Sequence, residues 1–190
     1  MSAVLITGPP GCGKTTLIRK AVTELGVAAA GFYTEEIRSP PTGSPSGASE
    51  SAKRTGQGAG RREGFALVTL DGRRTTLASM RIHGPHRVSK YGVDLEALET
   101  VGLPALENAD AKLLVIDEIG KMELFSQRFQ EAVARALDGA TPLLASIMIS
   151  RHPFPDTVKS RDDIRLINLT PENRDSALDE VVTALRELLR

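Results

Sequence analysis

Residues 3–6, 112–118, 142–147 and 164–168 are short runs rich in apolar residues, and more polar or amphipathic segments separate them. Apolar runs of this length between turn residues are typical of buried strands. Including the runs that alternate less cleanly, the strands that we expect are 3–6, 30–38, 64–70, 73–77, 112–118, 142–147 and 164–168. Asp71-Gly72 lies between two of them and predicts a tight hairpin.

Apolar positions recur with a helical period in several of the intervening segments. The helices that we expect are 15–25, 94–98, 103–108, 125–137 and a terminal helix from residue 170 onward. Gly26 ends the first of these helices, and Gly102 and Pro104 separate the two short ones. Thr170 caps the terminal helix, and Pro171 takes its first position. The apolar face of the helix 125–137 consists of Phe125, Phe129, Ala132, Val133 and Ala136. We expect residues 150–160 to form a loop.

Strands that alternate with helices predict an α/β fold, with three layers and a largely parallel central sheet to which one β-hairpin is added. The 190 residues are enough for a single well-buried domain over 1–190. Residues 39–62 interrupt the pattern, because 13 of these 24 residues are Gly, Pro or Ser and none is aromatic or a large aliphatic. Such a segment buries too little surface to offset its ordering entropy. We therefore expect a flexible insertion at 39–62.

A glycine-rich turn follows the first predicted strand and matches the phosphate-binding pattern Gly-x-x-x-x-Gly-Lys-Thr. Gly8, Gly11 and Gly13 let the backbone adopt conformations that a Cβ atom would forbid, so that consecutive N–H groups form an anion nest. The helix that follows adds its positive N-terminal end. Lys14 can reach the β- and γ-phosphates, and the hydroxyl of Thr15 can ligate Mg²⁺. The sequence thus predicts a nucleotide phosphate site.

The predicted strand 112–118 ends in two carboxylates, Asp117 and Glu118, in the form of a Walker B motif. A parallel sheet places its ligands at the carboxyl ends of its strands, so we expect Asp117 beside the glycine-rich turn. There it would hold Mg²⁺ together with Thr15. Glu118 would point the other way if the pleat of the strand continues, and would orient and deprotonate a water in line with the γ-phosphate.

Composition limits the classes of binding partner and the cellular compartment that we expect for this chain. Lys and Arg number 24, Asp and Glu number 24, and the sequence pI is near 6.9, so there is no strong sign of a nucleic-acid surface. Cys12 is the only cysteine, which excludes an internal disulfide and favours a reducing compartment. We expect Cys12 to fill space in its loop rather than to act as a redox switch. With neither a membrane span nor a leader segment expected, we predict a cytoplasmic protein, without excluding the nucleus, and a monomer.

Several stretches together resemble the cancer-related nucleoside-triphosphatase, or THEP-type, family of P-loop NTPases. They are Gly8–Thr15, Gly31–Glu36, Val115–Phe125 and Thr170–Arg174, of which Asp-Glu-Ile-Gly-Lys-Met-Glu-Leu is the most specific. The resemblance covers nearly the whole chain outside residues 39–62. This segment is longer than the loop that we would expect in that family. It implies a RecA-like P-loop fold and Mg²⁺-dependent hydrolysis of several nucleoside triphosphates, with diphosphates as poorer substrates.

The resemblance also implies two stretches of nucleotide contact. The first comprises Gly8, Pro9, Pro10, Gly11, Cys12, Gly13, Lys14 and Thr15, to which we add the neighbouring Thr16; the second comprises Leu113, Leu114, Val115, Ile116, Asp117, Glu118, Ile119 and Gly120. Within these stretches we assign Glu118 and Lys14 to catalysis, and Thr15 and Asp117 to the metal.

The residues alone are compatible with three functions. A nucleoside-triphosphatase with little base selectivity is favoured by Glu118 and by the lack of an Asn-Lys-x-Asp motif after Asp117 that would read guanine. A nucleotide or small-molecule kinase would use Tyr33, Glu35 and Glu36 to face an acceptor, beneath a lid that excludes water. A nucleotide-dependent binding switch would turn over slowly until a partner bound, but the sequence identifies no protein partner. Candidates for a cation that stabilises the transition state are Lys121, Arg161 and Arg174.

Overall fold

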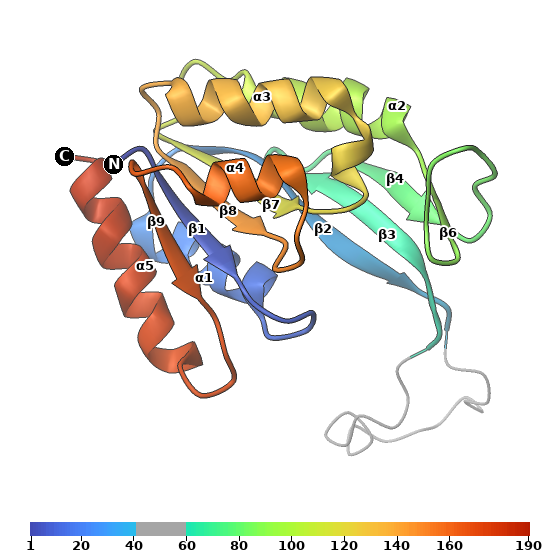
Figure 1. Cartoon of the computed structure of the whole chain (residues 1–190), viewed down its shortest axis with the longest axis horizontal. Helices are drawn as coiled ribbons and strands as arrows, with labels where there is room; N and C mark the ends of the chain where they lie inside the picture. Colours follow the sequence, from blue (N-terminus) through green and yellow to red (C-terminus); the bar gives the residue numbers. More distant parts are fainter. Residues whose placement is uncertain (41–59) are drawn as a thin grey trace.

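The computed structural model describes residues 1–40 and 60–190, and in these residues nine strands form one sheet with helices on both faces (Figure 1). The strands are β1 (Ala3–Thr7), β2 (Ala29–Arg38), β3 (Arg62–Thr69), β4 (Arg74–Ser79), β5 (Arg87–Val88), β6 (Tyr91–Val93), β7 (Leu113–Ile119), β8 (Leu143–Ile147) and β9 (Ile164–Asn168). All seven strands that the sequence predicts are present, whereas β5 and β6 were not predicted.

The sheet has a parallel half and an antiparallel half. Strands β2, β7, β8, β1 and β9 lie side by side in that order and run parallel. Beyond β2, the strands β3, β4, β6 and β5 continue the sheet with antiparallel pairing. The predicted hairpin is confirmed as β3 and β4, but β6 and β5 extend it. The antiparallel half is therefore larger than a single added hairpin.

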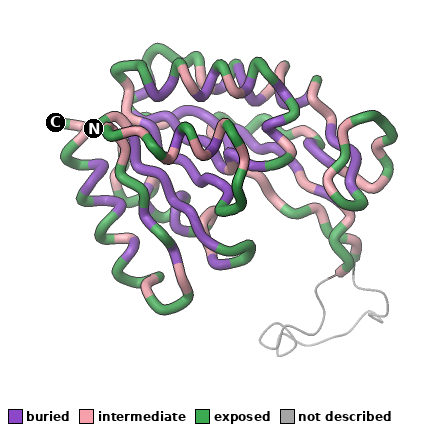
Figure 2. Tube along the Cα trace, viewed as in Figure 1, coloured by how far each residue is buried: buried purple, intermediate pink, exposed green. Residues whose placement is uncertain are grey.

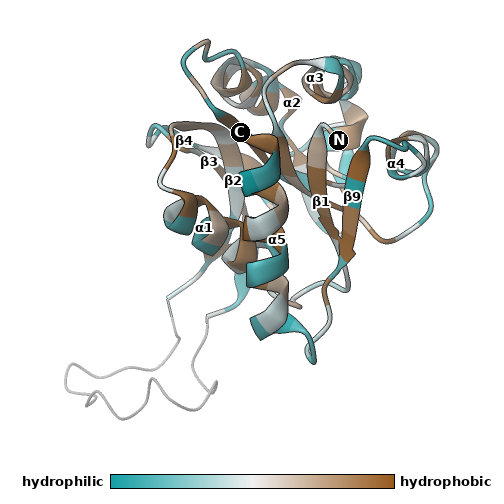
Figure 3. Ribbon diagram, turned by 90° about the vertical axis from the view of Figure 1, so that its left-hand side faces the viewer, coloured by the Kyte–Doolittle hydropathy of each residue, from teal (hydrophilic) through white to brown (hydrophobic). Residues whose placement is uncertain are grey.

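Two apolar clusters hold the helices against the two faces of the sheet. One face is covered by α1 (Lys14–Leu25) and α5 (Arg174–Leu188), whose inward residues pack on the strands in a cluster that includes Ile18, Val181 and Leu185. The opposite face is covered by α3 (Gln127–Asp138), α4 (Pro153–Lys159) and the helical segment 95–106 (Figure 1). The strands between them are buried over much of their length (Figure 2), and hydrophilic residues lie on the outer sides of the helices (Figure 3).

Segment 95–106 does not break where the sequence predicts. It runs from α2 (Leu95–Ala97) through a π-helical turn, η2 (Leu98–Gly102), into a 3₁₀ turn, η3 (Leu103–Leu106). Gly102 has ordinary right-handed helical angles, and a Cβ atom on it would lie 2.9 Å from the side chain of Leu67 and 3.4 Å from that of Phe32. This glycine therefore permits close packing on the sheet and does not end a helix.

Two further predictions on this face are wrong. The helix after β7 begins at Gln127 with Ser126 as its N-cap, so that Phe125 belongs to a separate 3₁₀ turn, η4 (Glu123–Phe125), and is 40% exposed. Phe129, Ala132, Val133 and Ala136 are buried as predicted. The expected loop 150–160 contains the helix α4, because Pro153 takes the first helical position, where its missing N–H has no cost.

The terminal helix begins three residues later than predicted. Thr170 does not cap it; instead α5 starts at Arg174 after Asn173. The side chain of Asn173 accepts a hydrogen bond from the backbone N–H of Thr170 (2.8 Å) and donates to the carbonyl of Asn168 (2.9 Å). These bonds fold residues 170–173 into a turn that connects β9 to α5.

The predicted flexible insertion at 39–62 falls mostly on residues 41–59, which lie outside the described residues. The described ends of that segment meet, since the backbone N–H of Ser39 donates to the carbonyl of Arg61 (2.9 Å) and β3 already begins at Arg62. The insertion therefore connects two paired strands, β2 and β3. Within the described residues, no helix combines the length and the apolar character that crossing a membrane requires.

We predict that Gly31→Ala will destabilise the fold far more than Gly72→Ala. Both glycines have positive φ angles, of 121° and 94°, but a Cβ on Gly31 would lie 1.9 Å from the carbonyl oxygen of Val115 in the neighbouring strand β7. Nothing lies within 4 Å of a Cβ on Gly72. Chemical denaturation should show a loss of about 1 kcal/mol for Gly72→Ala and about 3 kcal/mol or more for Gly31→Ala. Equal losses would contradict the packing argument.

Candidate active site

The glycine-rich turn connects β1 to α1 in the geometry that the sequence predicts. Gly8, Gly11 and Gly13 all have positive φ angles, of 150°, 77° and 104°. A Cβ on Gly8 would lie 2.4 Å from the carbonyl oxygen of Leu169, so only glycine fits there. The N-cap of α1, Gly13, offers no side-chain hydrogen bond to the first turn of the helix. The N–H groups of that turn are therefore available to an anion.

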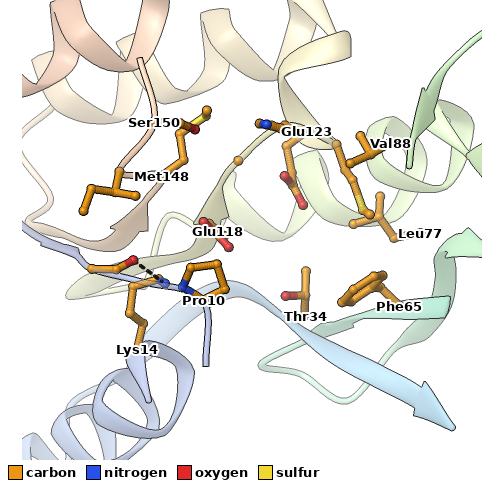
Figure 4. A pocket seen from close by; sticks show the side chains of 15 residues that line it. Pro10, Lys14, Thr34, Phe65, Leu77, Val88, Glu118, Glu123, Met148 and Ser150 are labelled. Carbon is orange, nitrogen blue, oxygen red and sulfur yellow. Dashed lines mark hydrogen bonds between the residues drawn. The ribbon is translucent and has the colours of Figure 1, made fainter. Parts of the chain in front are cut away.

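Lys14 crosses the mouth of this turn. Its Nζ donates hydrogen bonds to the carbonyl oxygens of Gly8 (3.1 Å; Figure 4) and Pro9 (3.2 Å). Cys12 is only 4% exposed and packs beneath the turn in the apolar cluster with α1 and α5. The burial of Cys12 agrees with the space-filling role expected from the sequence. Because α1 begins at Lys14, the positive charge of this side chain and the positive N-terminal end of α1 both lie beside the turn.

Asp117 joins the turn to the second motif. Thr15 Oγ1 donates to Asp117 Oδ2 over 2.5 Å, and Ser146 Oγ donates to Asp117 Oδ1. Asp117 ends the regular part of β7, and Ser146 lies on β8, the strand between β7 and β1. Sequence reasoning missed Ser146, although its place near the end of a predicted strand was a signal. The predicted meeting of Thr15 and Asp117 is present in the structure.

Glu118 faces a cavity of about 460 Å³ that Lys14 and Gly8 also line. In Figure 4, Lys14 and Pro10 lie at one end of this cavity and Phe65, Leu77 and Val88 at the other, with Glu118 between them. Pairing between β7 and β8 is irregular between Ile116 and Ile119, so the strict alternation assumed from the sequence does not hold at Glu118. Glu118 nevertheless lines the same cavity as Lys14, and its role toward a water stays a prediction.

Burial dominates the electrostatics of both motif carboxyls. It raises the pKa of Asp117 above its usual value, while the hydrogen bonds from Ser146 and Thr15 and the charge of Lys14 act in the opposite direction. Burial likewise raises the pKa of Glu118, which Lys14 opposes and Asp117 reinforces. Because both carboxyls are buried, a cation near them interacts with them more strongly than it would at the surface.

A third carboxyl, that of Glu123, lies in the same cavity, and sequence reasoning assigned it no role. Glu123 is 4% exposed, and burial, together with the charges of Glu118 and Asp117, raises its pKa to about 8. A Cβ on Gly120 would lie 3.1 Å from Glu123 Oε2 and 3.3 Å from Glu118 Cδ, so Gly120 leaves room for both carboxyls. The only sequence signal was the place of Glu123 within the family-like segment after Glu118.

The remaining residues of the implied contact stretches lie in different surroundings. Pro10 and Gly120 line the cavity, whereas Thr16 and Gly13 border a separate recess of about 310 Å³ near the start of α5. Several side chains of β7 are buried in the core and do not line the cavity, namely Leu113, Leu114, Val115, Ile116 and Ile119. A contact from these five residues to a nucleotide stays a prediction.

Of the three candidate cations, Lys121 lines the cavity with Glu118. Arg161 pairs with Asp138 (2.7 Å) and Asp163 (2.8 Å), next to the amino end of β9. That is the edge of the parallel strands opposite to the glycine-rich turn. Arg174 lies outside the turn, with its Nε 3.8 Å from the position of a Cβ on Gly13. Of these three side chains, Lys121 alone lines the cavity that contains Glu118.

The side chains proposed to face a kinase acceptor bind other residues. Glu35 pairs with Arg19 (3.3 Å) and with Arg74, and the guanidinium of Arg19 lies 4.5 Å from the ring centre of Tyr33. Glu36 pairs with two further arginines, Arg38 at the end of β2 and Arg62 at the start of β3. From this segment of β2, Thr34 lines the cavity instead. Tyr33, Glu35 and Glu36 are thus occupied on the surface of the sheet.

We predict that Glu123→Gln will change how stability depends on pH. The carboxyl of Glu123 has a pKa of about 8 in the folded protein and 4.5 as a free group, so unfolding releases its proton between these values. The free energy of unfolding of the wild type should therefore fall, relative to Glu123→Gln, by about 4 kcal/mol as the pH rises from about 5 to about 8. Denaturation at several pH values measures this difference.

The matched control is Glu180→Gln, which removes a surface carboxylate paired with Arg165. Its pH dependence should run parallel to that of the wild type, since exposed ion pairs contribute little. If Glu123→Gln also runs parallel to the wild type, Glu123 is not buried as a neutral acid.

The model of a family described as NTPase matches residues 3–57 and 51–182. A nucleoside-triphosphatase THEP1 from Thermotoga sp. (strain RQ2) is 40% identical over 185 residues, which cover 96% of this chain and 95% of the relative. The cancer-related nucleoside-triphosphatase of Homo sapiens is 40% identical over 205 residues and covers 96% of each chain.

Two solved structures share the fold along nearly the whole chain. The crystal structure of THEP1 from the hyperthermophile Aquifex aeolicus aligns with a TM-score of 0.79 at 35% identity, covering 96% of this chain and 98% of that one. The solution structure of a human cancer-related nucleoside triphosphatase aligns with a TM-score of 0.78 at 38% identity and covers 98% of both chains. The three-layer α/β architecture with its glycine-rich turn is thus the P-loop NTPase fold, and the chain belongs to the NTPase family that includes these nucleoside-triphosphatases.

Proposed function

We propose that this protein is a Mg²⁺-dependent nucleoside-triphosphatase that releases the γ-phosphate of ATP, GTP and other nucleoside triphosphates. The observation that carries the proposal is the convergence of Lys14, Thr15, Asp117 and Glu118 at the carboxyl end of the parallel strands. Relatives that are 40% identical over nearly the whole chain are named nucleoside-triphosphatases, which supports the same reaction.

The glycine-rich turn would hold the triphosphate. The free N–H groups at the start of α1 would bind the β-phosphate, and Lys14 would exchange its bonds to Gly8 and Pro9 for bonds to the β- and γ-phosphates. Lys121, which lines the same cavity, would face the γ-phosphate from the other side. These positive groups would stabilise charge on the oxygens as the phosphoryl group transfers.

The oxygen donors beside the turn suit Mg²⁺. Thr15 and Asp117 supply a hydroxyl and a carboxylate 2.5 Å apart, and Mg²⁺ is usually bound through one or two carboxylates together with the phosphates of the substrate. Thr15 and Asp117 would hold Mg²⁺ beside the phosphates, where its positive charge would offset theirs. The hydrogen bond from Ser146 to the other oxygen of Asp117 would keep that carboxylate in place.

Glu118 would act as the base. It faces the cavity beside Lys14. The hydrogen bonds from Thr15 and Ser146 go to Asp117 and not to Glu118. A water in line with the γ-phosphate would pass a proton to Glu118 while its oxygen bonds to phosphorus. The bond between phosphorus and the β–γ bridging oxygen would break, and the nucleoside diphosphate would leave.

Little base selectivity is part of the proposal. The groups named above all act on phosphates, and the sequence contains no Asn-Lys-x-Asp motif that would read guanine. Hydrolysis of nucleoside diphosphates should be weaker, because a diphosphate cannot fill the β- and γ-phosphate positions beside Lys14 and Glu118 in the same way.

We expect Glu118→Gln to lower kcat for phosphate release by about 10²- to 10⁴-fold, because the amide keeps the size of the side chain but cannot accept a proton. Affinity for the nucleotide should stay close to that of the wild type. The measurement is phosphate release from ATP, GTP, CTP and UTP with Mg²⁺, together with a direct nucleotide-binding titration.

The surface variant Glu180→Gln serves as the control for this experiment and should release phosphate at the wild-type rate. Tight nucleotide binding by the wild type without any phosphate release would refute hydrolysis. Release from only one of the four triphosphates would refute the lack of base selectivity.

The metal assignment predicts a difference between Thr15→Val and Thr15→Ser. The serine variant keeps the hydroxyl, whereas the valine variant keeps the shape of the side chain and removes the oxygen. We expect the Mg²⁺ concentration for half-maximal activity to rise about tenfold to a hundredfold in Thr15→Val, and to stay near the wild-type value in Thr15→Ser. Equal Mg²⁺ dependence in both variants would contradict a metal role for Thr15.

A further inference from the structure

The cavity beside Glu118 extends beyond the end where the phosphates and the attacking water belong. Its volume is about 460 Å³, and Lys14 and Pro10 lie at only one end of it. Cavities of a few hundred Å³ with mostly apolar walls and a few polar groups are typical of small-molecule sites. The cavity therefore has room for an organic molecule next to the place where the water would attack.

The walls change character along the cavity. The end at the glycine-rich turn is polar, with Lys14 and Glu118, while the far end is apolar and is formed by Phe65, Leu77 and Val88 (Figure 4). These three residues come from β3, β4 and β5, so the antiparallel half of the sheet builds the far end. We call this far end the apolar chamber.

The chamber lies on the nucleophile side of the phosphates. The β- and γ-phosphates belong beside Lys14 and Thr15, and Glu118 marks the side from which the γ-phosphorus is attacked. In an in-line displacement the leaving nucleoside diphosphate departs in the opposite direction. The nucleoside therefore extends away from Glu118, toward the recess of about 310 Å³ that Thr16, Leu169 and Arg174 border on the other side of the turn.

We propose that the apolar chamber binds a small, uncharged and largely apolar alcohol, and that the protein transfers the γ-phosphoryl group to its hydroxyl oxygen. This inference rests on the proposed hydrolytic function, because it uses the same phosphate site and the same base. The hydroxyl oxygen bonds to the γ-phosphorus, its proton passes to Glu118, and the bond to the β–γ bridging oxygen breaks. The products are a phosphate monoester and a nucleoside diphosphate.

The surroundings favour an uncharged acceptor. Phe65, Leu77 and Val88 would remove water from any charge in the chamber without replacing its hydrogen bonds, which is costly. The carboxylate of Glu118 also lies between the chamber and the turn, so it would repel a second anion there. Thr34 lies beside Phe65 in Figure 4, and its hydroxyl offers a hydrogen bond to one polar group of the acceptor.

The test measures how the γ-phosphoryl group divides between water and simple alcohols. The wild-type protein is incubated with ATP and Mg²⁺ in the presence of methanol, ethanol, propan-1-ol or butan-1-ol at equal molar concentration. Phosphorus NMR then quantifies the alkyl phosphate, inorganic phosphate and ADP. We expect the ratio of alkyl phosphate to inorganic phosphate to rise about fourfold with each added methylene, which is the transfer free energy of a buried methylene expressed as a ratio.

Two matched variants locate the effect. Val88→Trp fills the chamber, and Leu166→Trp makes the same kind of change on the exposed strand β9, where Leu166 is 42% exposed. We expect Val88→Trp to abolish the rise with chain length while phosphate release in water persists, and Leu166→Trp to behave as the wild type. Val88→Phe is a smaller change that tests the same point if the tryptophan variant does not fold.

Each result decides between the two claims. Inorganic phosphate alone, or a ratio that does not rise from methanol to butan-1-ol, would overturn the acceptor site and leave hydrolysis intact. A higher KM for ATP in Val88→Trp with an unchanged ratio would show that the chamber holds the nucleoside, and would also overturn the proposal. Alkyl phosphate without inorganic phosphate would support the acceptor site and refute hydrolysis, whereas neither product would overturn both.

Discussion

The hydrogen bond between Thr15 and Asp117 depends on the register of three parallel strands. Strand β8 lies between β1 and β7, and Leu144 is paired with Val4 on one side and with Val115 on the other. This shared register brings the turn after β1 and the end of β7 to the same height, so that Thr15 reaches Asp117 over 2.5 Å. A slip of one residue would turn the side chains of β7 to the opposite face and separate the two motifs.

The same arrangement gathers three carboxyl groups in a buried site. Asp117 raises the pKa of Glu118, both of these carboxyls raise the pKa of Glu123, and burial raises all three. Lys14 offsets part of this repulsion, and the missing Cβ of Gly120 gives two of the carboxyls room. The same low polarity that makes these groups costly in the folded protein strengthens their attraction for a metal ion and for the proton of a nucleophile.

The differences between the predicted and observed elements have a common cause. Thr170, Pro171 and Phe125 each carry a local signal for a helix start or an apolar helix face, but local signals of this kind allow more than one outcome. Ser126 caps α3 and Asn173 binds back to Asn168, and each of these choices moves a helix start past the predicted residue. The prolines of 150–160 likewise fit either a loop or the first turn of a helix, and packing of Val158 in the core selects the helix.

The sequence by itself determined the elements whose geometry is set by neighbouring residues. Gly8, Gly11 and Gly13 followed by Lys14 specify the turn and the helix start, and an apolar run before Asp117 specifies a buried strand; with the family-like segments, these patterns led to the P-loop fold. Only the tertiary structure showed the buried Glu123, the bond from Ser146 and the apolar chamber. These features join residues from β3, β4, β5, β7 and β8, and the order of strands in a sheet is decided by packing between distant segments, which no local pattern records.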